Sequence, residues 1–146
     1  MYALTIQQPY ASLIVGWPNM PAGIRKRVEN RSWRPPRDLG ALAIHAGKSR
    51  TWLATWDGPV PPQMPFGCIV GTAAVLACFP IESIRDARAM SYRWRWLARH
   101  MHAHGPYCWV LGAVHRFEDP IPMVGKQGLW RVDDALLTGK RLRVEG

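Results

Sequence analysis

The sequence predicts an α+β fold, a small mixed β-barrel with two or three flanking helices, in one domain of residues 1–146. The 146 residues are 48% hydrophobic and 20% charged, which is typical of a single soluble globular domain. Short segments with the pattern of strands are separated by Gly and Pro at frequent intervals. These segments lack the regular strand–helix alternation of a doubly wound parallel sheet, so a small barrel with outer helices fits better.

The first half of the chain contains three predicted strands and one predicted helix. Tyr2–Ile6 alternates in hydrophobicity, as a strand does. Pro9 suits the start of a helix because its missing N–H is not needed there, and Gly16 suits the end. Residues 24–31 alternate charged side chains around an apolar centre, and residues 39–46 are mostly apolar. Both segments therefore predict strands.

The second half begins with the most apolar segment, 68–79, which predicts a central strand. Gly71 within it marks a β-bulge or a close backbone approach. Residues 83–104 predict a helix, or two helices that meet near residue 90, and Gly105 ends this region. The remaining predictions are strands at 107–117, 128–132 and 140–144 and a helical turn at 135–137.

The charge balance points to an anionic partner. Lys and Arg number 19 against 10 Asp and Glu, which gives a net charge of +9, and 15 of the 19 are Arg. Nucleic acid is the commonest partner of so basic a protein. Codon bias in a GC-rich genome can explain the Arg excess but not the net charge. The eight Trp residues suit either core packing or stacking on bases.

The sequence also excludes several classes of protein. Three widely spaced cysteines predict neither a disulfide framework nor a zinc ribbon. No signal peptide and no apolar stretch of membrane-spanning length is present. We therefore expect a cytoplasmic protein with reduced thiols and no membrane association. No cofactor is expected, since the motifs of the common nucleotide-dependent and hydrolytic enzymes are missing.

The basic segment 25–37 is the densest candidate for function. If it is a strand, one face carries a carboxylate between guanidiniums with an indole beside them: Arg25, Arg27, Glu29, Arg31 and Trp33. The other face carries Lys26, Val28 and Asn30. The first face can hold phosphate, stack a base and accept a hydrogen bond from a base edge. The alternative is a solvated edge strand in which Glu29 pairs with its arginines.

Histidines and lysines elsewhere provide weaker candidates. His45 lies near the end of the predicted strand 39–46 and Lys48 follows it, although His45 also fits a core histidine with satisfied hydrogen bonds. On a helix over 83–104, Arg95, Arg99 and His102 share one face, which is a phosphate site or a solvated surface. No metal site is predicted, because a helix places only two of the histidines 100, 102 and 104 on one face.

Six short segments, in order, make the chain similar to the ASCH domain family. The segments are Leu4–Ala11, Val28–Arg34, Leu42–Lys48, Gly67–Gly71, Gly105–Leu111 and Lys126–Trp130. The resemblance implies a PUA-like barrel with a cleft that binds single-stranded RNA or a nucleotide. It places in that cleft the ligand-binding residues Gln8, Pro9, Tyr10, Arg31, Trp33, His45 and Trp109. It also places there Glu29, Lys48 and Tyr107, which are the catalytic candidates if the protein is an enzyme.

The resemblance leaves open whether the protein is an enzyme. One branch of the family hydrolyses acylated cytidine with a lysine, a threonine and a glutamate. Lys26 matches that lysine, but Glu29 occupies the threonine position, so the nucleophile is absent. Another branch is described as a ribonuclease, which acid–base groups can support without a metal. A third alternative is a small accessory protein that binds another protein through Arg95 and Trp96.

Overall fold

The computed structural model describes residues 1–137 and 142–144, with side chains for 1–137. Its contacts group into two compact units. Unit 1 comprises Met1–Arg25, Ala41–Ala74 and the chain from Ala113, and unit 2 comprises Lys26–Gly40 and Val75–Gly112. The prediction of a single domain over residues 1–146 stays a prediction.

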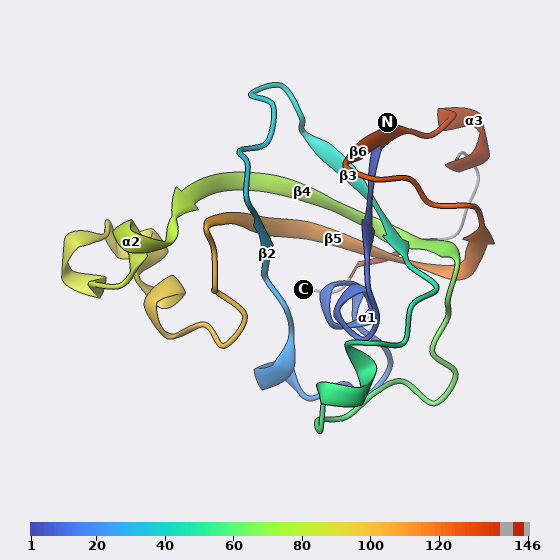
Figure 1. Cartoon of the computed structure of the whole chain (residues 1–146), viewed down its shortest axis with the longest axis horizontal. Coiled ribbons are helices and arrows are strands. Elements are labelled where there is room, and N and C mark those ends of the chain that lie inside the picture. Colours follow the sequence, from blue (N-terminus) through green and yellow to red (C-terminus); the bar gives the residue numbers. More distant parts are fainter. Residues whose placement is uncertain (138–141, 145–146) are drawn as a thin grey trace. The chain divides into compact units, whose positions relative to one another are not determined.

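The described strands form one mixed sheet in the order β2-β5-β4-β3-β1-β6, with β7 paired to β5 (Figure 1). The strands are β1 (Tyr2–Ile6), β2 (Val28–Arg31), β3 (Ala41–Ala46), β4 (Cys68–Pro80), β5 (Tyr107–Pro122), β6 (Leu129–Arg131) and β7 (Leu142–Val144). β1 and β3 are parallel, whereas β1·β6, β2·β5, β3·β4 and β5·β7 are antiparallel pairs. The α+β class is confirmed. Within the described residues the strand order has two ends, so the predicted closure into a barrel is not confirmed.

Short helices connect the strands. The α-helices are α1 (Tyr10–Val15), α2 (Ile81–Ile84) and α3 (Asp134–Leu137). The 3₁₀ helices are η1 (Ala22–Ile24), η2 (Leu53–Thr55), η3 (Ala87–Ala89) and η4 (Tyr92–Arg99). As predicted, Pro9 precedes the first helix and Gly16 ends it, with its N–H bonded to Ser12 O at 2.8 Å.

In unit 1, β1 lies between β3 and β6 and has an almost wholly buried apolar side. The core cluster consists of Ala3, Ala43, Ile69, Phe117, Trp130 and Val132. The register of β3 against β4 shifts between Ile44 and His45, opposite Gly71 and Ile69. A Cβ on Gly71 would lie 2.2 Å from His115 O. The prediction of a bulge or a close approach at Gly71 is therefore confirmed.

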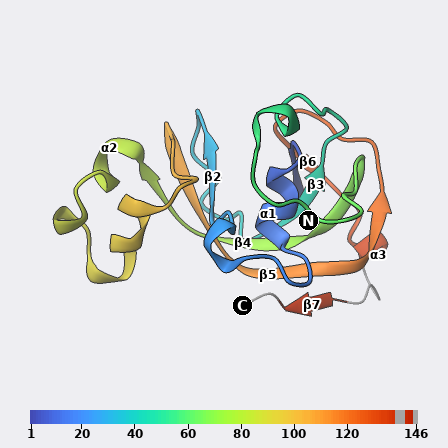
Figure 2. The same cartoon turned by 90° about the horizontal axis from the view of Figure 1, so that it is seen from below.

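In unit 2, β2 pairs antiparallel with the first residues of β5, and the segment between β4 and β5 forms α2, η3 and η4 (Figure 2). Its core cluster consists of Val28, Ile84, Met90, Leu97, Cys108 and Val110. Burial of these side chains contributes about 25 cal/mol for each Å² of apolar surface removed from water.

Some predicted elements differ from the structure in type or in bounds. A continuous helix over 83–104 is wrong, because the region contains the end of one turn of α-helix followed by two 3₁₀ helices. The break between η3 and η4 lies at residues 90–91, where the alternative of two helices placed it. Trp94 and Leu97 both pack in the core of unit 2, and their spacing of three residues suits the 3₁₀ period. The strand over 24–31 is shorter than predicted and begins at Val28. At the tail, β7 confirms a strand over 142–144, while residues 140–141 of that prediction lie outside the described residues.

Candidate functional site

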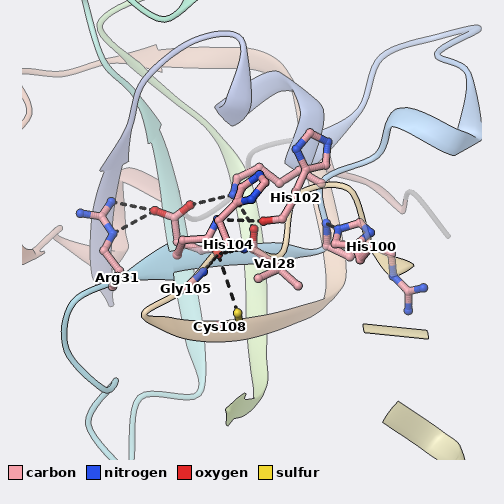
Figure 3. A network of polar contacts seen from close by, with 11 residues as sticks. Val28, Arg31, His100, His102, His104, Gly105 and Cys108 are labelled. Atoms are coloured by element: carbon pink, nitrogen blue, oxygen red, sulfur yellow. Dashed lines mark hydrogen bonds and ion pairs between the residues drawn. The ribbon is translucent and has the colours of Figure 1, made fainter. Parts of the chain in front are cut away.

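A buried carboxylate lies between two cations in unit 2. Glu29 on β2 is 6% exposed, and its Oε1 lies 3.3 Å from Lys26 Nζ. Arg31 Nε and Nη2 each lie 2.9 Å from Glu29 Oε2 (Figure 3). Lys26 is 5% exposed, so both members of the Lys26–Glu29 pair are removed from water. We call Lys26, Glu29, Asn30, Arg31, His100 and His102 the β2 polar cluster.

The late start of β2 places Lys26 beside Glu29. The sequence predicted these two side chains on opposite faces of a strand, which is wrong because Lys26 precedes the strand. Its ammonium turns back and also donates to Val28 O. Arg27 likewise precedes the strand, and its guanidinium carbon lies 3.9 Å from the centre of the Trp96 ring. Of the predicted charged face, the structure therefore retains the contact of Glu29 with Arg31.

Asn30 connects β2 to the turn before β5. Its Nδ2 donates to His102 O at 2.8 Å, and its Oδ1 accepts from the N–H groups of His104 and Gly105 at 2.8 Å each (Figure 3). Cys108 Sγ also donates weakly to Oδ1 at 3.8 Å. An amide that satisfies three backbone groups fixes the position of the turn.

His100 is a neutral hydrogen-bond acceptor in this cluster. Its Nε2 accepts from the Arg27 N–H at 3.0 Å. Burial lowers the pKa of His100 to about 4, and the positive charges of His102, Lys26, Arg27 and His104 lower it in the same direction. Its ring lies edge-on to His102, with the ring centres 5.5 Å apart. At neutral pH the imidazole is therefore uncharged and adds no repulsion to Lys26.

Aromatic side chains follow the polar cluster along β2 and β5. Trp33 is half-buried and meets the wholly buried Trp109 edge to face at 4.9 Å. Trp109 Nε1 donates to Trp33 O at 3.0 Å. The Arg34 guanidinium carbon lies 4.7 Å from the centre of the Tyr107 ring. The Trp33 ring is thus partly exposed to solvent, and the buried Trp109 packs against it from the core.

Unit 1 contains a cavity of about 400 Å³ next to the end of β3. Its polar lining consists of Thr5, Gln7, His45, Lys48, Lys126 and Gln127, and Gly47, Val124 and Gly125 complete the wall. Both lysines are exposed. The two ammonium groups can bind a phosphate, and the neighbouring carboxamides can hydrogen-bond another polar group of the same ligand. We call this the β3 cavity.

Gln7 Oε1 is a buried acceptor at this cavity, and no described residue donates a hydrogen bond to it. Gly47 permits its position, since a Cβ there would lie 2.5 Å from Oε1. Leaving a buried carbonyl without a donor costs about 1–3 kcal/mol. A ligand hydroxyl or amine that reached this oxygen would remove that cost.

His45 has both ring nitrogens in hydrogen-bond contact. Nδ1 lies 3.1 Å from Thr5 Oγ1 on the neighbouring strand, and Nε2 lies 2.7 Å from Met123 O. This is the geometry of a satisfied core histidine, although one edge of the ring also lines the β3 cavity.

The other residues predicted for the cleft in unit 1 are Gln8, Pro9 and Tyr10. Gln8 is fully buried, and its amide bonds Ser12 and Pro65 O, so its polar atoms hold the start of α1. Pro9 is also buried, and Tyr10 is half-buried with its ring edge-on to Trp56 at 6.4 Å. Whether any of the three contacts a ligand stays a prediction.

The structure divides the predicted catalytic residues between the units: Glu29 and Tyr107 belong to unit 2 and Lys48 to unit 1. Sequence reasoning missed Gln7, Lys126 and Gln127, although each lies inside a segment that carried the family resemblance. It also left Asn30 and His100 without a role. Their contacts bridge more than 70 residues of sequence, and a single sequence contains no signal for them.

Comparison with known proteins gives one family. The ASCH domain model matches residues 4–121, a range that includes the β2 polar cluster and Lys48 but not Lys126. The search of curated proteins finds no match. Across the described residues, no helix has the length and apolar character needed to cross a bilayer. In the same part of the chain, no three His, Cys, Asp or Glu side chains converge as metal ligands.

Proposed function

The chain belongs to the ASCH domain family, and on this premise we propose that it binds single-stranded RNA or a nucleotide. The observation that supports this most directly is the β3 cavity, in which two lysines flank a buried carboxamide oxygen that lacks a donor. The lysines suit a phosphate. Gln7 Oε1 can accept a hydrogen bond from a sugar hydroxyl or a base amine.

Unit 2, taken by itself, carries a separate group of side chains suited to a base and a phosphate. The partly exposed ring of Trp33 is the stacking platform, and Arg31 is the phosphate contact. Glu29, oriented by Lys26 and Arg31, is the acceptor for a base edge or a 2′-hydroxyl. The net charge of +9 supplies long-range attraction for the same ligand.

Binding of a labelled oligouridylate at several salt concentrations tests the proposal. Lys48→Ala and Lys126→Ala should each weaken binding and reduce the slope of log K against log salt by about 0.7. Arg131→Ala removes an equal charge from an exposed position of unit 1 and is the matched control. If both lysine variants behave like the control, the β3 cavity is not a phosphate site.

A hydrolase is the second candidate, and the contact of Lys26 Nζ with Glu29 Oε1 favours it. A buried amine beside a carboxylate can serve as an acid–base pair without a metal, with Lys48 and Tyr107 as further candidates. Incubation with labelled RNA and with acylated nucleosides separates the two functions. Turnover that disappears in Glu29→Gln, with binding retained, would establish the hydrolase; no turnover of either substrate class would leave binding alone.

A further inference from the structure

The segment between α2 and β5 carries a group of exposed arginines. Five arginines, at positions 85, 88, 93, 95 and 99, are exposed, and so is Tyr92, at 87%. Arg88 has a carboxylate partner, Asp86 at 3.8 Å. In the described part of the chain, no carboxylate lies within ion-pair distance of the other four. We call residues 85–99 the arginine segment.

Two of these guanidiniums lie over aromatic rings. The guanidinium carbon of Arg93 lies 4.4 Å from the centre of the Trp94 ring, and that of Arg95 lies 5.9 Å from the Tyr92 ring. Arg95 Nε also donates to Met90 O at 3.2 Å. A guanidinium held by a ring keeps N–H donors for an anion and loses less side-chain entropy on binding it.

The segment is anchored to the core of unit 2. Ile84, Met90 and Leu97 are buried, and Trp94 meets Phe79 with the ring centres 5.7 Å apart. The exposed arginines therefore project from a packed 3₁₀ segment rather than from a loose loop.

Arg27 and His100 join this segment to the β2 polar cluster. The Arg27 guanidinium lies over the Trp96 ring, and the Arg27 backbone N–H donates to Nε2 of His100, the residue that follows η4. Within unit 2, these two contacts link the arginine segment to the residue that precedes β2.

We propose that the arginine segment is a second contact surface for single-stranded RNA, in which Arg93, Arg95 and Arg99 bind phosphates and Tyr92 stacks on a base. The choice of RNA rests on the proposed function. The exposed Tyr92 ring beside guanidiniums supports it, because a base offers a flat face for the ring and a phosphate for the arginines. An acidic protein would use the charges but has no need of that ring.

The test compares two multiple variants in binding of a fluorescent 20-nucleotide oligouridylate over a salt series. Arg93→Ala/Arg95→Ala/Arg99→Ala should weaken binding at least tenfold and reduce the salt slope by about 2, as for three lost phosphate contacts. The control Arg37→Ala/Arg50→Ala/Arg131→Ala removes three exposed charges elsewhere. Equal losses in the two variants would overturn the proposal, since net charge alone would then explain the effect.

Tyr92→Ala tests the aromatic contact. Binding should weaken about 5- to 150-fold with little change in salt slope, and Tyr92→Phe should restore it, because stacking needs the ring and not the hydroxyl. A thermal melt of Tyr92→Ala should match that of the wild type, given the exposure of the side chain. Unchanged RNA binding by Tyr92→Ala would remove the stacking role and with it the argument for RNA over an acidic partner.

Two further results separate this proposal from the proposed function. If Lys48→Ala/Lys126→Ala binds RNA normally while the arginine-segment variant does not, the β3 cavity proposal fails and the arginine segment stands. The reverse pattern overturns the arginine segment alone. If polyglutamate competes with the oligouridylate at equal charge concentration for wild type but not for the arginine-segment variant, the surface is a general polyanion site and the assignment to RNA is wrong.

Discussion

The two units differ in how they bury polar groups. In unit 1, the side chains of Gln8 and His45 have backbone groups and hydroxyls as their partners. In unit 2, Lys26 and Glu29 are opposite charges buried against each other. Neutral buried groups cost little when their hydrogen bonds are made, whereas a buried ion pair rarely stabilises a fold better than apolar side chains would. Gln8 and His45 therefore serve the architecture of unit 1, while the buried charges of unit 2 require another reason.

The largest expected effect comes from breaking the buried ion pair. Glu29→Leu should lower the free energy of unfolding by about 3–5 kcal/mol, because Lys26 is left with a buried charge and no carboxylate. Lys26→Met/Glu29→Leu should recover most of that loss. Denaturant unfolding of both variants measures this. A single variant within 1 kcal/mol of wild type would mean that Glu29 is solvated, as the alternative of an exposed edge strand requires.

Asn30→Ala should have the next largest effect, a loss of about 2–3 kcal/mol, since the carbonyl of His102 and the N–H groups of His104 and Gly105 lose their partner. Asn30→Asp is the informative companion, because it keeps the acceptor and loses only the donor to His102 O. Hydrogen exchange of the Gly105 amide should speed up in Asn30→Ala and not in Asn30→Asp. Equal exchange in the two variants would contradict the role of the Asn30 oxygen.

A smaller effect is expected in unit 1. His45→Leu should cost about 1–2 kcal/mol, because Thr5 Oγ1 and the Met123 carbonyl each lose their hydrogen-bond contact with the imidazole. A thermal melt measures the loss. If His45→Leu lowers the free energy of unfolding as much as Glu29→Leu does, breaking the Lys26–Glu29 pair costs no more than removing the hydrogen bonds of His45, and the contrast between the units fails.

The smallest expected effect is a change in pH dependence. His100 has a pKa of about 4 in the folded chain against an ordinary value of 6.5, so the unfolded chain takes up the proton first as the pH falls. The contribution of the neutral ring to stability is therefore complete above about pH 6.5 and is lost between about pH 6.5 and pH 4.

His100→Gln keeps an acceptor for the Arg27 N–H but does not titrate. Its free energy of unfolding should fall less than that of the wild type over the same interval, by about 1 kcal/mol after allowance for solvent screening of a partly exposed ring. Parallel pH profiles for the two proteins would contradict the lowered pKa of His100.

The sequence by itself determined the local periodicities and the family. The alternation of Tyr2–Ile6, the apolar run at 68–79 and the bulge or close approach at Gly71 depend on neighbouring residues, so they were predicted correctly. The ordered segments of the family resemblance are also a property of sequence alone. The closeness of Glu29 and Arg31 followed from the two-residue repeat of a strand.

Only the tertiary structure decided which polar groups meet. Lys26 reaches Glu29 because it precedes β2, whose register with β5 begins at Val28, and Asn30 finds its partners more than 70 residues away. The 3₁₀ geometry of η4 arises where Trp94 and Leu97 pack against the core of unit 2. Gln8 and Gln7 are adjacent and chemically identical, yet the amide of Gln8 is hydrogen-bonded to Ser12 and Pro65 before the start of α1, whereas Gln7 lines the β3 cavity. Such distinctions depend on packing between distant segments, which hydrophobic pattern and residue spacing do not encode.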